Sequence, residues 1–190
     1  LVGGADVINT TGTITLVGTG GNTSGNSSGN RGVEIQDSGS TVTSVSGNIS
    51  ITGTGQGTAS GSIGVQVFNG AVTSTGAAAS SVTGTGSAGA QGISLVSASP
   101  ILGSATATGN ITLKSDFFDW GGGAINTSGN VYIAPKTAST AVSMGSGTTG
   151  VFVRTSELSA IDTRVNRVYV GTDGTTTTAG TVTIGSVIKI

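Results

Sequence analysis

The stretch SDFFDWGGG, residues 115–123, gathers residue types that suit sugar recognition. It contains the only Trp of the chain, two of its four Phe and two of its eight acidic residues. Aromatic faces can stack on sugar rings, and carboxylates accept hydrogen bonds from sugar hydroxyls. The candidate glycan contacts are Phe117, Phe118, Trp120, Asp116 and Asp119. The competing interpretation is structural: the rings plug a wider core at a point where the repeat of the chain changes type.

Catalytic chemistry has few residues to build on. Glycoside hydrolysis needs two carboxyl groups held across a cleft, and Asp116 and Asp119 form the best pair among eight scattered acids. The chain has no His and no Cys, which excludes Ser–His–Asp triads and the usual zinc sites. Gly3–Asp6 and Gly171–Asp173 are only isolated fragments of the glycine–aspartate repeats that bind calcium. We therefore predict no catalytic residue, no metal and no cofactor, and we expect a protein that is not an enzyme.

The composition narrows the class of protein further. The 190 residues include 35 Gly, 32 Thr and 26 Ser, whereas charged residues make up 8% and the net charge is −1. No basic surface is available to neutralise phosphates, so nucleic acid is not an expected partner. No apolar run approaches the roughly 18–20 residues of a membrane span. Mean hydropathy is +0.25, and the regular spacing of aliphatic residues favours a folded chain over a Gly/Ser linker.

A short pattern of alternating residues recurs along the chain. In VSGNISITGTG, residues 45–55, Ile49 and Ile51 alternate with polar residues between glycine turns, which is typical of a half-buried strand. Similar apolar pairs are Ile14/Leu16, Val33/Ile35, Val65/Val67, Ile93/Leu95, Ile111/Leu113, Val131/Ile133, Val151/Val153, Val168/Val170, Val182/Ile184 and Ile188/Ile190. Two types of strand alternate in the first half with a loose period near 30 residues, which indicates a solenoid.

The fold prediction is all-β: a right-handed parallel β-helix (solenoid) of about 7–8 coils, taking roughly 20-odd residues per coil. The competing fold is an antiparallel sandwich. A sandwich would require several tight hairpin turns, but the sequence has only two dipeptides typical of them, the Asn-Gly at 69–70 and the Asp-Gly at 173–174. Helical periodicity is absent, apart from one expected helical turn in SELSAID, residues 156–162, with Thr155 or Ser156 as the N-cap.

Three asparagines hold the same place in a G-N-[IV] motif: Asn48, Asn110 and Asn130. Stacked from coil to coil, their side-chain amides would bond along the axis as an Asn ladder. An equally good explanation is that each Asn is a turn residue after Gly.

Threonine pairs of the form T-x-T indicate ice binding as a second candidate function of the surface. They occur at 13–15, 41–43, 106–108 and 181–183, and rows of Thr on a flat β-helix face can bind ice. The pattern is broken at GNISI and NVYIA. Thr is also favoured on solvent-facing strands for its β-propensity alone.

The second half of the chain resembles the repeat unit of filamentous-haemagglutinin-like exoproteins. The matching motifs are Gly109–Leu113, Asp116–Asp119, Gly122–Ile125, Gly129–Pro135, Glu157-Leu158, Arg167–Thr172 and Gly180–Ile184. The resemblance is strong over 107–190 and looser over the Gly/Ser/Thr-rich repeats of 1–106. It implies a structural rod, stalk or filament segment of a secreted or surface-displayed bacterial adhesin of the two-partner-secretion type. The N-P-N motifs of that family's secretion domain are missing, which implies stalk rather than secretion domain.

The two ends of the sequence look uncapped. LVGGADVI opens the chain and GTVTIGSVIKI closes it, without an amphipathic helix, Pro or charge run, although solenoids normally blunt their ends. We expect a single β-helical segment, 1–190, of a longer chain or fibre. The expected partners are further repeats of the same chain or end-to-end copies of itself, and then host or environmental glycans. The alternative functions are a carbohydrate-binding or polysaccharide-degrading β-helix and an ice-binding β-helix.

Overall fold

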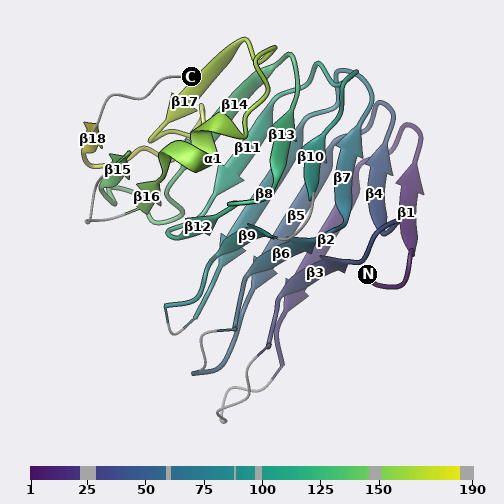
Figure 1. Cartoon of the computed structure of the whole chain (residues 1–190), viewed down its shortest axis with the longest axis horizontal. Helices are drawn as coiled ribbons and strands as arrows, with labels where there is room; N and C mark the ends of the chain where they lie inside the picture. Colours follow the sequence, from purple (N-terminus) through teal and green to yellow (C-terminus); the bar gives the residue numbers. More distant parts are fainter. Residues whose placement is uncertain (22–28, 59–60, 88, 97–99, 146–150, 185–190) are drawn as a thin grey trace.

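The computed structural model describes residues 1–21, 29–58, 61–87, 89–96, 100–145 and 151–184. These residues form eighteen short strands and one helix (Figure 1). All fourteen pairings between the strands are parallel. The protein is therefore all-β with parallel sheets, and the antiparallel sandwich does not describe it.

The strands form four sheets. Sheet A contains β1 (Asp6–Asn9), β4 (Thr41–Ser44), β7 (Ala71–Ser74), β10 (Ile101–Gly103) and β13 (Ala124–Asn126). Sheet B contains β2 (Ile14–Thr19), β5 (Ile49–Thr54), β8 (Ser80–Thr85), β11 (Ile111–Lys114), β14 (Asn130–Ala134) and β17 (Arg167–Val170). Sheet C contains β3 (Val33–Gln36), β6 (Val65–Phe68), β9 (Ile93–Val96) and β12 (Phe118–Asp119). Sheet D contains β16 (Val151–Val153), β15 (Val142–Met144) and β18 (Val182–Ile184).

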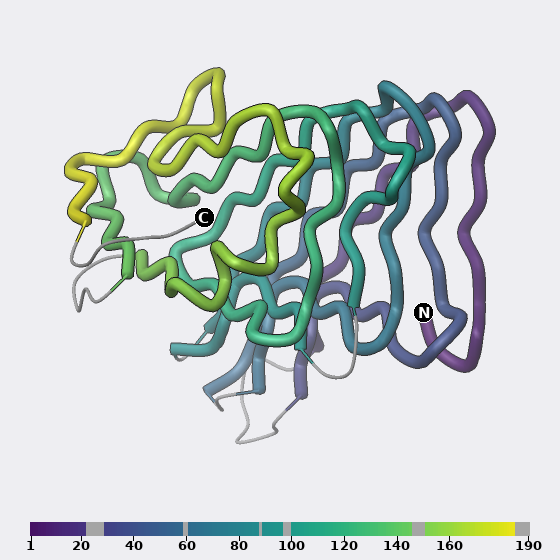
Figure 2. Tube along the Cα trace, turned by 45° about the horizontal axis from the view of Figure 1, so that its top comes forward, coloured from purple at the N-terminus to yellow at the C-terminus, as the bar shows by residue number. Residues whose placement is uncertain are grey.

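Hydrogen-bonded neighbours in sheets A, B and C are three strands apart in the chain, as in the order β2–β5–β8. The chain visits the three sheets in turn and returns beside its own previous strand. Figure 2 shows these turns side by side, from the purple N-terminal turn to the yellow C-terminal region. This arrangement is compatible with a β-helix.

The length of a turn differs from the sequence expectation. Ile49 lies opposite Ile14, 35 residues on, and Val65 lies opposite Ile93, 28 residues on. The offset falls to 20 only between Ile111 and Val131. The last offset on sheet B, between Val131 and Val168, is again long at 37 residues. Turns longer than expected therefore use up the chain, and the largest sheet has six strands. The prediction of 7–8 coils was therefore too high for the described residues.

The core consists of two columns of inward side chains on sheet B and their counterparts on sheets A and C. The sheet B columns are Ile14, Ile49, Ser80, Ile111, Val131, Val168 and Leu16, Ile51, Val82, Leu113, Ile133, Val170. The aliphatic members on the four middle strands are at most 1% exposed. Burying one such side chain contributes roughly 1.5–3 kcal/mol, so each turn is stabilised by the turns above and below it.

One expected inward pair lies at the surface. Val182 and Ile184 of β18 are 45% and 66% exposed, because β18 is an outer strand of sheet D with β15 on one side only. The Ile188/Ile190 pair lies outside the described residues.

The helix α1 (Thr155–Ser159) begins one residue earlier than predicted. Its N-cap is Arg154, not Thr155 or Ser156, and the Glu157 carboxylate accepts a hydrogen bond from the Arg154 backbone N–H at 2.6 Å. Leu158 is 1% exposed and joins the core. α1 lies near the end of the stack opposite β1 (Figure 1), where the helical turn expected in SELSAID contributes Leu158 to the core.

A glycine seam joins sheet B to the segments that lead into sheet C. It pairs Gly18 with Gly32, Gly53 with Gly64, and Gly84 with Gly92. A Cβ on the first glycine of each pair would overlap the carbonyl oxygen of the second. The two segments therefore meet backbone to backbone, and only glycine fits at the inward position there.

Candidate functional site

The aromatic residues of 115–123 do not form a surface platform. Phe118 and Trp120 are fully buried and meet edge to face, with ring centroids 5.4 Å apart. Phe117 is only half-buried. The prediction that Phe118 and Trp120 stack on sugar rings is therefore wrong, because neither ring reaches solvent. They fill the core where the offset between turns shortens, for example to 25 residues between Ile93 and Phe118.

Trp120 is held in place by α1. Its indole Nε1 donates to the Glu157 backbone carbonyl at 2.6 Å, and its backbone N–H faces the Glu157 carboxylate at 3.4 Å. Glu157 is fully buried, with Arg154 Nη1 3.1 Å from its Oε1. Burial raises the pKa of Glu157, although the hydrogen bond and charge of Arg154 and the N–H of Trp120 oppose the rise.

The two carboxylates of the segment serve separate structural contacts. Asp116 Oδ1 accepts hydrogen bonds from the backbone N–H groups of Lys136 and Thr137, each at 2.9 Å. Asp119 lies 3.7 Å from Arg154. A hollow of about 220 Å³ is lined by Asp116 and Phe117 together with mostly glycine and small residues, but Asp119 is not part of its wall. The pair does not face one another across a cleft, as glycoside hydrolysis requires.

The predicted asparagines lie in one column along sheet B, but only two of the three are on consecutive turns. Asn48 Oδ1 accepts from the Ala79 backbone N–H at 2.9 Å, and Asn110 Oδ1 accepts from that of Asn130 at 3.0 Å. Asn110 and Asn130 are neighbours, whereas the turn carrying Ala79 separates Asn48 from Asn110. Asn166, which does not follow a glycine and was missed in the sequence, donates its amide to Asn130 Oδ1 at 3.0 Å. Each contact ties one turn to the next.

An ion pair between Lys114 and Asp173 holds a C-terminal loop against the outer face of sheet B. Lys114 Nζ lies 2.8 Å from both Asp173 Oδ2 and Thr177 Oγ1. Asp173 Oδ1 also accepts the backbone N–H groups of residues 175, 176 and 177, each at 2.9 Å. Although burial opposes it, hydrogen bonds from Lys114 and these N–H groups hold the pKa of Asp173 well below its ordinary value. Asp173 thus fixes the conformation of this loop and ties it to β11.

We expect these two carboxylates to give stability a maximum at mildly acidic pH. The raised pKa of Glu157 favours folding most below its ordinary value of 4.5, and this contribution is lost as the pH rises. The lowered pKa of Asp173 favours folding above 3.8, and this contribution is lost as the pH falls. Urea unfolding between pH 7 and pH 2 measures both slopes. Glu157→Gln should flatten the neutral limb and Asp173→Asn the acidic limb; a variant that leaves its own limb unchanged contradicts the assignment.

Hydroxyl side chains form rows on the outer face of sheet B. The rows are Thr15, Ser50, Ser81, Thr112; then Val17, Thr52, Thr83; then Thr19, Thr54, Thr85. The sequence motif that marks them is the recurring Thr-Gly-Thr at 52–54 and 83–85. It differs from the four T-x-T pairs considered above for the alternative of ice binding. The glycine of each triplet belongs to the seam, so the seam and the rows come from the same motif.

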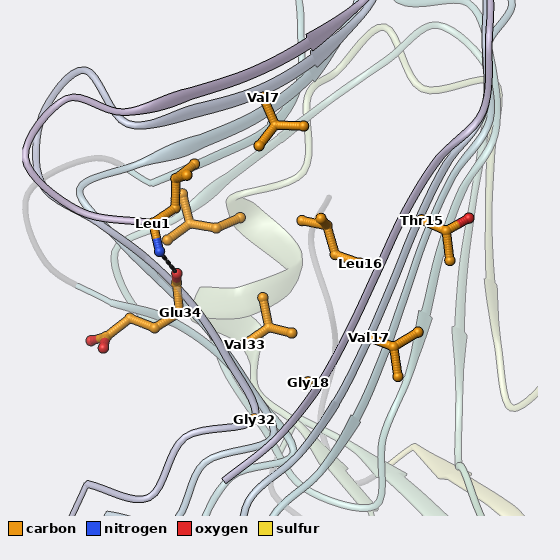
Figure 3. A pocket seen from close by; sticks show the side chains of 10 residues that line it. Leu1, Val7, Thr15, Leu16, Val17, Gly18, Gly32, Val33 and Glu34 are labelled. Carbon is orange, nitrogen blue, oxygen red and sulfur yellow. Dashed lines mark hydrogen bonds between the residues drawn. The ribbon is translucent and has the colours of Figure 1, made fainter.

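The N-terminal end of the stack is an open apolar mouth. β1, β2 and β3 are the outermost strands of sheets A, B and C at this end. Between them lies a hollow of about 420 Å³, toward which Leu1, Val7, Leu16 and Val33 point (Figure 3). Leu1 pairs with β3: its amino group donates to the Glu34 carbonyl at 2.8 Å, and its carbonyl accepts the Gln36 N–H at 2.7 Å.

Other site types find little support in the described residues. No group of three or more acidic side chains lies together there as a metal site would require. Of the helices in the part of the chain that the structure describes, none has the length and apolar character to cross a membrane. No protein-family model, curated protein or solved structure matches the chain significantly.

Proposed function

We propose that the chain is a structural rod segment: a right-handed parallel β-helix in which each turn stacks in register on the one before. The observation that carries this proposal is the shared order of sheets A, B and C, in which every strand pairs with the strand three positions away. A core that continues from turn to turn, without a concentrated polar site, suits a stalk or filament better than a catalyst. No enzymatic activity is part of the proposal.

We further propose that the rod belongs to a secreted or surface-displayed bacterial adhesin-like protein. The support is the resemblance of the motifs in 107–190 to filamentous-haemagglutinin-like repeats, together with an exterior rich in Ser and Thr. Charged residues make up only 8% of the chain. This low content fits a stalk, because each turn of a stalk contacts other turns of the same kind along the axis. Extracellular location is part of the same proposal.

Ice binding is the second candidate function. The observation that favours it is the set of Ser and Thr rows on the outer face of sheet B, which spans three turns with only Val17 interrupting it. Neighbouring rows are separated by the distance between alternate residues of one strand. Within a row, neighbouring side chains are separated by the distance between neighbouring strands, about 4.8 Å. Thermal hysteresis lost in Thr52→Lys but retained in Thr43→Lys on sheet A would establish it; the absence of hysteresis in the unmodified chain would exclude it.

The rod proposal is tested by deleting one whole turn. Removal of residues 49–79 takes out β5, β6 and β7, and brings β8 to the position of β5 against β2. Stability of a stacked repeat is roughly a sum over neighbouring turns, so we expect a folded β-rich chain that melts cooperatively at a lower temperature. The matched control removes residues 49–64, half a turn, and should not fold. Equal loss of structure in both deletions would contradict the proposal.

A further inference from the structure

The hollow of about 220 Å³ beside Phe117 lies where the connections from sheet B to sheet C become short. Successive connections are residues 20–32, 55–64, 86–92 and 115–117. Because 115–117 is the shortest of them, the turn that follows β8 leaves space beside residues 84–86. Residues 84–86 line one side of this space and residues 115–117 line another. The hollow therefore results from the change in turn length, in the middle of the stack.

A backbone donor is left over at this hollow. On the two earlier turns, the first N–H after the strand bonds to the next turn: Gly20 N–H and Gly55 N–H each donate to a carbonyl there at 2.8 Å. Gly86 holds the same place after β8, but β11 pairs with β8 only as far as Lys114. Among the described residues no carbonyl accepts the Gly86 N–H. By the same geometry this N–H points toward the next turn, where the hollow lies.

The side chains around the hollow have the chemistry that a sugar ring needs. Phe117 contributes a half-buried aromatic ring, whose face can stack on the apolar C–H face of a pyranose. Asp116 Oδ2 accepts a hydrogen bond from the Thr137 hydroxyl at 2.6 Å, and a carboxylate oxygen can accept a second one from a sugar hydroxyl. Thr85 adds a hydroxyl group from the outer row of sheet B.

Asp116 and the backbone of Phe117 are fixed by contacts within the protein. The backbone N–H groups of Lys136 and Thr137 each hold Asp116 Oδ1 at 2.9 Å. Ser115 Oγ donates to the Phe117 carbonyl at 2.9 Å and accepts the Phe117 N–H at 3.1 Å. A ligand would therefore have to order little of this wall when it binds, which favours affinity.

Size and charge narrow the class of ligand. Pockets for drug-sized ligands measure roughly 300–1,000 Å³, so a hollow of about 220 Å³ suits a single small ring. Among the described residues that line it, Asp116 alone carries a charge. A negative charge in the wall disfavours acidic sugars and leaves neutral ones.

We propose that this hollow binds one neutral hexopyranose unit. The C–H face of the sugar lies on Phe117, one hydroxyl donates to Asp116 Oδ2, and another accepts the Gly86 N–H. This site goes beyond the rod and ice-binding functions, and it does not depend on either of them. It retains two residues of the aromatic and acidic segment, Asp116 and Phe117, and does without the buried rings.

The test measures binding of the methyl glycosides of glucose, galactose, mannose and N-acetylglucosamine by NMR titration. We expect at least one of them to bind with a dissociation constant in the millimolar range. The backbone amide shifts should change around Gly86 and Phe117, and not on sheet A. Methyl glucuronide, which carries a carboxylate, should bind more weakly than the neutral glycosides.

Two pairs of variants separate the site from general effects on folding. Phe117→Ala and Phe68→Ala each remove a half-buried ring, but Phe68 is not part of the wall. Phe117→Ala should raise the dissociation constant roughly tenfold, and Phe68→Ala should leave it unchanged. Thr85→Val should raise it about fivefold, whereas Thr54→Val, in the same outer row one turn earlier, should not.

Circular dichroism establishes that each variant folds. If Phe117→Ala does not fold, the threonine pair decides, because both of its members lie on the outer face of sheet B. No binding of any neutral glycoside by the unmodified chain at tens of millimolar would overturn the inference. Equal losses within either pair, or a preference for methyl glucuronide, would overturn it too.

Discussion

Replacing Gly84 by Ala is expected to lower the free energy of unfolding by roughly 3 kcal/mol or more, at the upper end of the cost of overpacking. The added Cβ would overlap the carbonyl oxygen of Gly92. That oxygen belongs to backbone and cannot swing aside as a flexible side chain does. The seam between β8 and the segment entering β9 would therefore have to open, and the shift would pass to the turns stacked on it. Urea unfolding followed by circular dichroism measures the loss.

Gly21→Ala is the matched control for this prediction. Gly21 has no atom within 4 Å of the place a Cβ would take, so the change should stay within about 0.5 kcal/mol of the unmodified chain. Gly53→Ala, at the seam one turn earlier, should behave like Gly84→Ala. Equal tolerance at Gly21 and Gly84 would mean that the segments do not touch backbone to backbone.

Replacing Trp120 by Ala should cost about 3–5 kcal/mol, as large-to-small changes of buried aromatic residues do. The indole is fully buried, packs edge to face on Phe118 and donates to the Glu157 carbonyl. Its removal leaves a cavity beneath α1 and takes from the Glu157 carbonyl one of two hydrogen bonds, the other being donated by the Ala160 N–H. As the only Trp of the chain, Trp120 should also give blue-shifted fluorescence in the folded state, which reports unfolding directly.

The comparison with Phe117 separates a core role from a surface role. Phe117→Ala removes a half-buried ring from the same segment and should cost clearly less than Trp120→Ala. Trp120→Phe should recover part of the stability, because it restores apolar volume but not the indole N–H. A Trp120→Ala variant as stable as the unmodified chain would contradict the buried position.

Alternation of residue types was enough to predict most strands and their inward faces. Ile49, Ile51, Ile111 and Leu113 were identified as core residues because period-two patterning is a local property of the chain. The parallel pairing was also within reach, because tight hairpin turns are few. The loose period near 30 agrees with the length of most turns, whereas the typical repeat of roughly 20-odd residues gives too many coils.

Tertiary packing decided what the pattern could not predict. Phe118 and Trp120 combine rings with neighbouring acids, as a sugar site does, and only the change in turn length places them in the core. Arg154 caps α1 because the Glu157 carboxylate reaches back to its N–H, and Arg is not among the usual N-cap residues. Asp173 depends on Lys114, 59 residues away, so no local motif marks their contact.

The stacking of turns is tested most directly by disulfide trapping between neighbouring strands. The chain has no cysteine, so each introduced pair is unambiguous. Thr52 and Thr83 are directly opposite on β5 and β8, and neighbouring strands lie about 4.8 Å apart, within the Cα separation of about 4.4–6.8 Å that a disulfide spans. Val17 is two strands from Thr83 in the same row, at about twice that separation. The stacked arrangement predicts rapid intramolecular oxidation of Thr52→Cys/Thr83→Cys and none of Val17→Cys/Thr83→Cys. Failure of the first pair, or equal oxidation of both, would contradict it.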